Sequence, residues 1–275
     1  MAVISKAEFK RRFRSPCPVK CEILELLRSE DQIASLSAFF SAIDGVVKGD
    51  DLFRGHEETR WSLTPKALRP RTVGDRESAL DLMSDFKRIA EAKLGRVPEP
   101  DDAYKWVQVA QHYGLPTRLL DWTQSAPVAL YFACLKPNED GLVFIFNPKD
   151  LNRQGALSEA RILDPEADQE LIRQFLRVGP REPGRRRYPL AVNPIWSSER
   201  LIVQKGTFTL HGSIFSLDSA KIPSLVAVPI LKESKPKLRS ELRRVGVDEM
   251  TLFPELEHSC RHLTMWAKCG LLAFD

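Results

Sequence analysis

The sequence has few of the features that define secreted, membrane-spanning or disulfide-rich proteins. Its five cysteines are odd in number, and a chain of 275 residues needs no disulfide framework, so we expect free thiols. No apolar run reaches the roughly 18 residues that cross a membrane. The first residues, MAVISKAEFKRRFRSP, lack the apolar core of a signal peptide. We therefore expect a folded cytoplasmic protein that does not enter a membrane.

The common catalytic signatures are also missing. There is no phosphate-binding Gly-x-x-x-x-Gly-Lys-[Ser/Thr] loop, no Gly-x-Ser-x-Gly elbow and no His-Glu-x-x-His. The only local cluster of histidine and cysteine contains His258, Cys260 and His262. On a helix the two histidines share a face while Cys260 points elsewhere, and Cys17 and Cys21 lack a second pair. We expect no bound metal.

What is present is close to the globular average. The chain has 43% hydrophobic and 28% charged residues, and 41 lysines and arginines against 37 aspartates and glutamates give a net charge of only +4. Basic residues cluster at 10–14, 181–187 and 232–244. Such clusters are typical of solvated surfaces, and nucleic-acid phosphates remain an alternative partner for them.

Hydrophobic periodicity predicts an α+β fold with a central mixed or antiparallel sheet flanked by helices. One boundary stands out near residue 45, which divides a helical N-terminal extension (1–44) from a main domain (45–275). Expected helices lie at 21–27, 33–43, 77–94, 101–113, 125–134, 165–177, 238–245 and 254–269. Expected strands lie at 51–55, 118–123, 142–146, 191–195, 201–203, 207–210 and 225–229.

Several polar residues sit at the ends of core-like segments. Arg54 ends an apolar stretch and precedes Gly55; a charge there needs a partner, while glycine lets backbone or ligand come close. Thr123 and Ser125 precede a helix, where free amides and the dipole favour an anion such as a pyrophosphate.

Two explanations of these residues stay open. In one, Arg54 simply pairs with Asp121 and His112 satisfies a core carbonyl. In the other, the polar residues surround one pocket. That pocket would contain Arg54, His112, Arg118, Asp121, Thr123 and Gln204. A carboxylate in a buried strand needs a partner, so Asp121 would orient an arginine or His112 there.

These segments resemble the FRG domain, a family named for its Phe/Tyr-Arg-Gly motif. The resemblance covers about residues 45–265, and its members are similar to bacterial and phage proteins, some of them in defence or toxin settings. It implies fold identity but little chemistry. The matching segments are 53–55, 61–65 with Arg69, 111–123, 129–133, Arg200, 204–208 and 252–256.

A second set of motifs is similar to mono-ADP-ribosyltransferases of the Arg-Ser-Glu class. This resemblance implies that NAD is the substrate and that Arg54, beside Gly55, binds its diphosphate. Thr123 or Ser125 would position the nicotinamide ribose. Glu199 would bind a ribose hydroxyl and stabilise the developing positive charge. Gln204 is the alternative for this last position, without the charge.

The competing interpretation is a binding module without chemistry. Arginine side chains match phosphates bidentately, so an arginine-lined pocket would recognise a nucleotide or nucleic-acid phosphates. The arginines concerned are Arg54, Arg69, Arg118 and Arg200.

Overall fold

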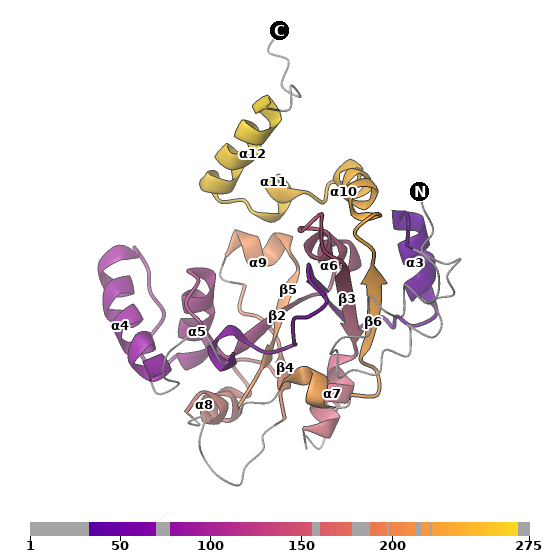
Figure 1. Cartoon of the computed structure of the whole chain (residues 1–275). Coiled ribbons are helices and arrows are strands. Elements are labelled where there is room, and N and C mark those ends of the chain that lie inside the picture. Colours follow the sequence, from indigo (N-terminus) through magenta and orange to yellow (C-terminus); the bar gives the residue numbers. More distant parts are fainter. Residues whose placement is uncertain are drawn as a thin grey trace.

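A single six-stranded sheet organises the protein (Figure 1). The computed structural model describes residues 33–69, 78–155, 160–177, 188–196, 198–212, 216–220 and 222–268. The strand order is β4-β5-β2-β1-β3-β6, and each pair of neighbouring strands is antiparallel. The expected α+β class is confirmed, with the antiparallel form of the sheet. The strands are β1 (Leu52–His56), β2 (Leu119–Thr123), β3 (Gly141–Phe146), β4 (Leu190–Val192), β5 (Gly206–Leu210) and β6 (Val226–Ile230).

Helices pack around the sheet, and the last of them extends away from it (Figure 1). In the described ranges no helix is long and apolar enough to cross a membrane. The helices are α3 (Leu36–Asp44), α4 (Ser78–Lys93), α5 (Ala103–His112), α6 (Ala126–Ala133), α7 (Pro148–Gln154), α8 (Gln169–Arg177), α9 (Glu199–Val203), α10 (Lys235–Arg244), α11 (Glu249–Leu252) and α12 (Leu256–Lys268), with short 3-10 turns at Lys66–Leu68 and Leu217–Ala220.

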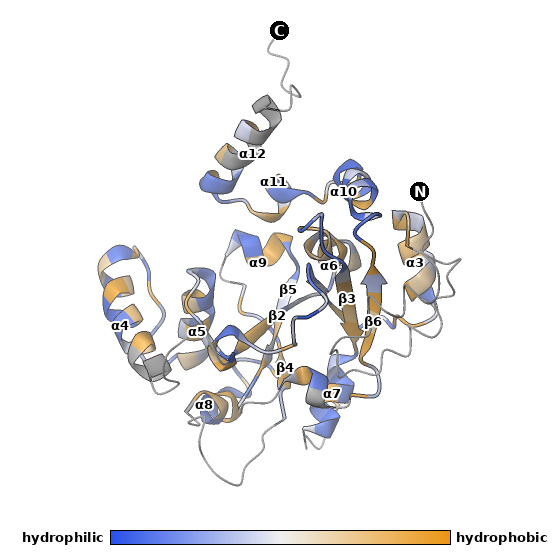
Figure 2. Ribbon diagram, in the orientation of Figure 1, coloured by the Kyte–Doolittle hydropathy of each residue, from blue (hydrophilic) through white to orange (hydrophobic). Residues whose placement is uncertain are grey.

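Strand β3 shows why the sheet is buried on both faces. All six of its residues are buried. Val143 and Ile145 belong to a core cluster that includes residues of α3, α6 and α10, whereas Leu142 and Phe144 belong to a second cluster. Because alternate residues of a strand point to opposite faces, a continuous apolar run is stable only when both faces are covered. Figure 2 accordingly shows hydrophobic colour on β3, β6 and α6.

Capping side chains fix where several helices begin. Ser35 accepts from the Ala38 amide at 3.1 Å at the start of α3, and Asp102 accepts from the Lys105 amide at 3.0 Å at the start of α5. The helix expected at 101–113 therefore begins two residues later than expected, at Ala103.

One predicted strand is wrong. Residues 201–203 are helical and belong to α9, which Ser198 caps by accepting from the Leu201 amide at 3.3 Å. Ile202 and Val203 are exposed, so this β-branched run forms no part of the sheet. Helices α7 and α11 were not predicted. The helix expected at 21–27, Cys17 and the basic segments 10–14 and 181–187 lie outside the described residues.

Candidate functional site

A cavity lies where the sheet opens between β1 and β2. Five residue pairs join β1 to β3 and five join β2 to β5, but only the pair Phe53–Thr123 joins β1 to β2. Backbone groups beyond that pair need other partners. Arg54 supplies one, because its Nη1 donates to the Asp121 carbonyl oxygen at 2.5 Å.

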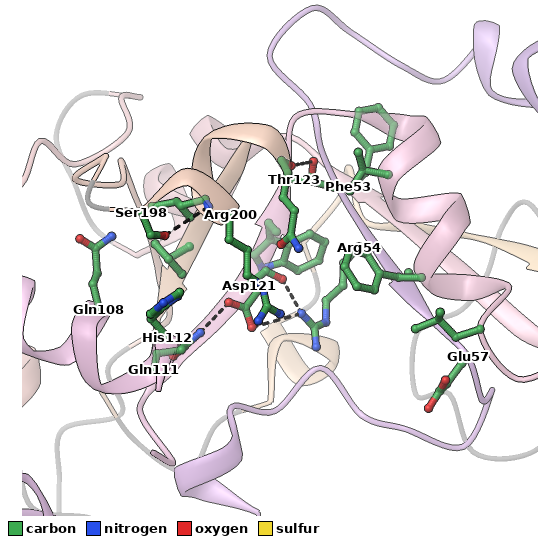
Figure 3. A pocket seen from close by; sticks show the side chains of 18 of the residues that line it. Phe53, Arg54, Glu57, Gln108, Gln111, His112, Asp121, Thr123, Ser198 and Arg200 are labelled. Atoms are coloured by element: carbon green, nitrogen blue, oxygen red, sulfur yellow. Dashed lines mark hydrogen bonds and ion pairs between the residues drawn. The ribbon is translucent and has the colours of Figure 1, made fainter. Parts of the chain in front are cut away.

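The cavity has a volume of about 330 Å³. Residues of β1 and β2 line it, together with side chains from α5, α6 and α9; Figure 3 shows these side chains from close by. Seven of the residues predicted for the site line it: Arg54, Gly55, His112, Asp121, Thr123, Arg200 and Gln204.

Arg54 is a largely buried cation with part of its donor capacity unused. Its side chain is 17% exposed, and its Nε donates to His56 Nε2 at 3.0 Å. Burial lowers the pKa of Arg54 to about 10; Asp121 opposes this effect and Arg69 adds to it. Arg54 therefore stays charged at neutral pH. Its Nη2 has no hydrogen-bond partner among the described residues, so it is available to a ligand.

His56 orients the Arg54 side chain by accepting a hydrogen bond from its Nε. Its imidazole is buried, and burial, reinforced by Arg54 and Arg69, holds its pKa well below the usual value of 6.5. A neutral imidazole can accept the Arg54 Nε–H at Nε2, which requires the proton to sit on Nδ1. His56 was not among the predicted site residues.

Asp121 projects outward between two buried residues of β2. Its side chain is 64% exposed, whereas Leu120 and Trp122 are buried on the opposite face. Asp121 therefore faces away from the apolar side of the strand, because β2 alternates its faces. Asp121 Oδ2 lies 3.9 Å from Arg54 Nη1, and Gln111 Nε2 donates to Oδ1 at 2.6 Å. Figure 3 shows Arg54 and Gln111 reaching Asp121 from two sides.

Two other lining residues, Gln204 and Arg200, contact the end of α11. Gln204 Nε2 donates to the Leu252 carbonyl at 2.9 Å, and the Arg200 guanidinium lies 4.7 Å from the centre of the Phe253 ring. Burial lowers the pKa of His112, which Glu255 opposes and Arg200 reinforces. The cavity thus carries a second cation and a neutral histidine.

The hydroxyl of Thr123 is already engaged by the protein. Its Oγ1 donates to the Gln204 carbonyl at 2.6 Å and accepts from the Ser125 amide at 3.0 Å. Pro127 in the first turn of α6 has no N–H. The amides expected to hold an anion at this helix start are thus partly satisfied or missing.

Three predicted site residues do not line the cavity. Arg118 Nη1 donates to the Gly212 carbonyl at 2.9 Å, and burial lowers its pKa. Glu199 is exposed in the first turn of α9, and Ser125 is the N-cap residue of α6. The structure therefore separates these three side chains from the group around Arg54.

Gln108 is a lining residue that sequence reasoning missed. It is 4% exposed, and its Oε1 accepts from the Ile195 amide at 3.2 Å. Its Nε2 is buried without a hydrogen-bond partner among the described residues. The available signal was its spacing from Gln111 and His112, which places all three on one face of α5. Glu57 and Ser198 also line the cavity and were not predicted.

In the part of the chain that the structure describes, no group of three or more His, Cys, Asp or Glu side chains is placed to hold a metal ion.

The fold and the cavity define an α+β protein with a buried arginine at a break in an antiparallel sheet. Residues 50–141 match the family model of the FRG domain, so the chain contains an FRG domain. The match includes Arg54, His112 and Asp121, whereas Arg200 and Gln204 lie beyond it. No curated protein and no solved structure gave a significant match.

Proposed function

We propose that the cavity binds a nucleotide-type anion, with NAD as the dinucleotide to test. The observation that carries this proposal is Arg54, a buried cation whose Nη2 is unpaired beside the cavity. A buried charge is costly unless it is paired, and a guanidinium matches phosphate oxygens in geometry and charge. A phosphate at this position would complete the partners of Arg54.

Two further features support a ligand of this class. Gln108 contributes a buried donor without a partner, which is costly unless a ligand acceptor meets it. Trp61 and Phe132 line the same cavity and offer flat apolar surface for a base. These side chains support a ligand that combines a phosphate with a base.

Calorimetric titration with NAD and with inorganic pyrophosphate tests the proposal. Arg54→Lys keeps the charge but loses the planar fork, so we expect at least about tenfold weaker binding, or about 1.4 kcal/mol. Arg88→Lys, on the exposed side of α4, is the matched control and should bind like the wild type. Wild-type protein that binds neither compound at millimolar concentration would exclude the proposal. A short single-stranded oligonucleotide in the same assay tests nucleic-acid phosphates as the source of the anion.

ADP-ribosyl transfer is the second candidate, and the sheet order favours it. Arg54 lies on β1 and Thr123 on β2, and Gln204, at the end of α9, precedes β5, the strand next to β2; all three residues line one cavity. In this reaction the bond from ribose C1′ to the nicotinamide nitrogen breaks and nicotinamide leaves with the electron pair. An acceptor then bonds to C1′ and loses a proton. Gln204, the alternative to Glu199 for the position that binds the ribose hydroxyl, lines the cavity, whereas Glu199 does not.

Mass spectrometry of nicotinamide released from NAD separates the two candidates. A transferase that uses Glu199 should retain binding but lose release on Glu199→Gln, because the role arises only as charge develops. A transferase that uses Gln204 should lose release on Gln204→Ala and keep it on Glu199→Gln. A binding module should bind NAD and release no nicotinamide even as the wild type.

A further inference from the structure

The cavity holds a carboxylate directly beside its buried cation. Asp121 Oδ2 lies 3.9 Å from Arg54 Nη1, and the Asp121 side chain is 64% exposed. A bare phosphate bound at Arg54 would bring its negative charge close to this carboxylate. The pair is therefore better suited to a ligand that carries hydrogen-bond donors next to its anionic group.

A chain of hydrogen bonds fixes the position of this carboxylate. The Leu119 amide donates to Thr117 Oγ1 at 3.2 Å, which leaves the Thr117 hydroxyl to donate to Gln111 Oε1. Gln111 must then present its nitrogen to Asp121, where it donates to Oδ1 at 2.6 Å. Because the acceptor is already ordered, ligand binding does not have to restrict the Asp121 side chain much further.

We infer that Asp121 recognises a ribose hydroxyl pair, so that the ligand is a ribose-bearing nucleotide and not a bare phosphate or pyrophosphate. An ionised carboxylate only accepts hydrogen bonds, so the matching ligand group must donate. Vicinal ribose hydroxyls meet that need, and carboxylates bind them in other dinucleotide sites. This inference rests on the proposed function, because it places the ribose next to the anion at Arg54.

The first test compares NAD with inorganic pyrophosphate in calorimetric titrations of the Asp121→Asn protein. The substitution keeps the shape of the side chain but replaces an acceptor with a donor. We expect NAD to bind at least about tenfold more weakly, while pyrophosphate binds as before or more tightly. Asp85→Asn is the control, since Asp85 is 56% exposed on α4 and lies outside the cavity.

A second measurement uses wild-type protein alone. ADP should bind at least about tenfold more tightly than 2′,3′-dideoxy-ADP, which lacks both hydroxyls. Equal affinities for the two compounds, or an Asp121→Asn protein that binds NAD as tightly as the wild type, would overturn the inference and leave the proposed function standing. A protein that binds pyrophosphate but not NAD would also overturn the inference and leave the proposed function standing. A protein that binds neither NAD nor pyrophosphate would exclude both the inference and the proposed function.

Discussion

Replacing Gly55 with alanine should destabilise the protein strongly, because strand β1 packs directly on the backbone of α6. A Cβ atom at this position would lie 1.9 Å from the Ala129 carbonyl oxygen and 2.6 Å from the Ala133 amide nitrogen. Both obstacles are backbone atoms of the buried helix α6, at its middle and at its last residue, so no side-chain rotation relieves them. The glycine of the Phe-Arg-Gly motif is therefore required by packing, whatever the cavity binds.

The expected magnitude follows from the required movement. Ordinary van der Waals contact begins at 3.4 Å, and the added Cβ would lie 1.9 Å from the Ala129 oxygen. Helix α6 would therefore have to move away from β1 by about 1.5 Å in a close-packed interior. Insertion of a methyl group into a filled core typically costs about 1–3 kcal/mol, and a backbone obstacle places this case at or above the upper end. A loss of about 3 kcal/mol corresponds to a fall in Tm of roughly 6–12 °C for a chain of this size.

Thermal and urea unfolding of Gly55→Ala measure this effect, with Gly45→Ala as the control. Gly45 has φ −76° and no atom within 4 Å of its added Cβ. Its substitution should therefore change the free energy of unfolding by no more than about 0.5 kcal/mol. A Gly55→Ala protein with a Tm within about 2 °C of the wild type would refute the packing argument.

Two further predictions concern buried polar groups. The folded-state pKa of His56 lies below 6.5, so below that pH the unfolded chain binds more protons than the folded protein. The free energy of unfolding should therefore fall as the pH drops below about 6.5, by up to about 1.4 kcal/mol per pH unit. Urea titrations of His56→Gln should show a weaker dependence of this free energy on pH. Asn152 is fully buried, accepts from the Ala191 amide at 2.7 Å and donates to the Ala191 carbonyl at 3.0 Å. Asn152→Ala should cost about 2–4 kcal/mol in urea unfolding, and a cost below about 1 kcal/mol would show that these backbone groups find other partners.

Local sequence predicted most elements but failed where local preference and tertiary context disagree. The run Leu201-Ile202-Val203 favours a strand by residue type, yet the cap at Ser198 makes it helical. A hydroxyl N-cap followed by Glu199 was a visible helix signal. In a segment this short, β-branched residues and a cap give opposite predictions, and only the neighbouring strands decide between them.

The candidate site was predictable in its residue types and only partly in its geometry. Arg54 and Asp121 were identifiable because charges inside apolar segments need a physical reason. Arg118 carries the same signal, but its guanidinium is used to hold the Gly212 carbonyl. The orientation of these side chains depends on the single residue pair between β1 and β2, which arises from the sheet order and leaves no trace in local sequence.

Because only one residue pair joins β1 to β2, these two strands depend on later strands when the chain folds during synthesis. Strands β1 and β2 leave the ribosome early, but their extensive partners, β3 and β5, are made after them. The outer edge of β2 therefore stays unpaired until residues 206–210 emerge, and unpaired edges invite association with other chains. A chain interrupted before that point would carry Arg54 and Asp121 but no β5 to support them. Such a fragment is a candidate for aggregation or chaperone capture, and it would not act as a weakened version of the whole protein.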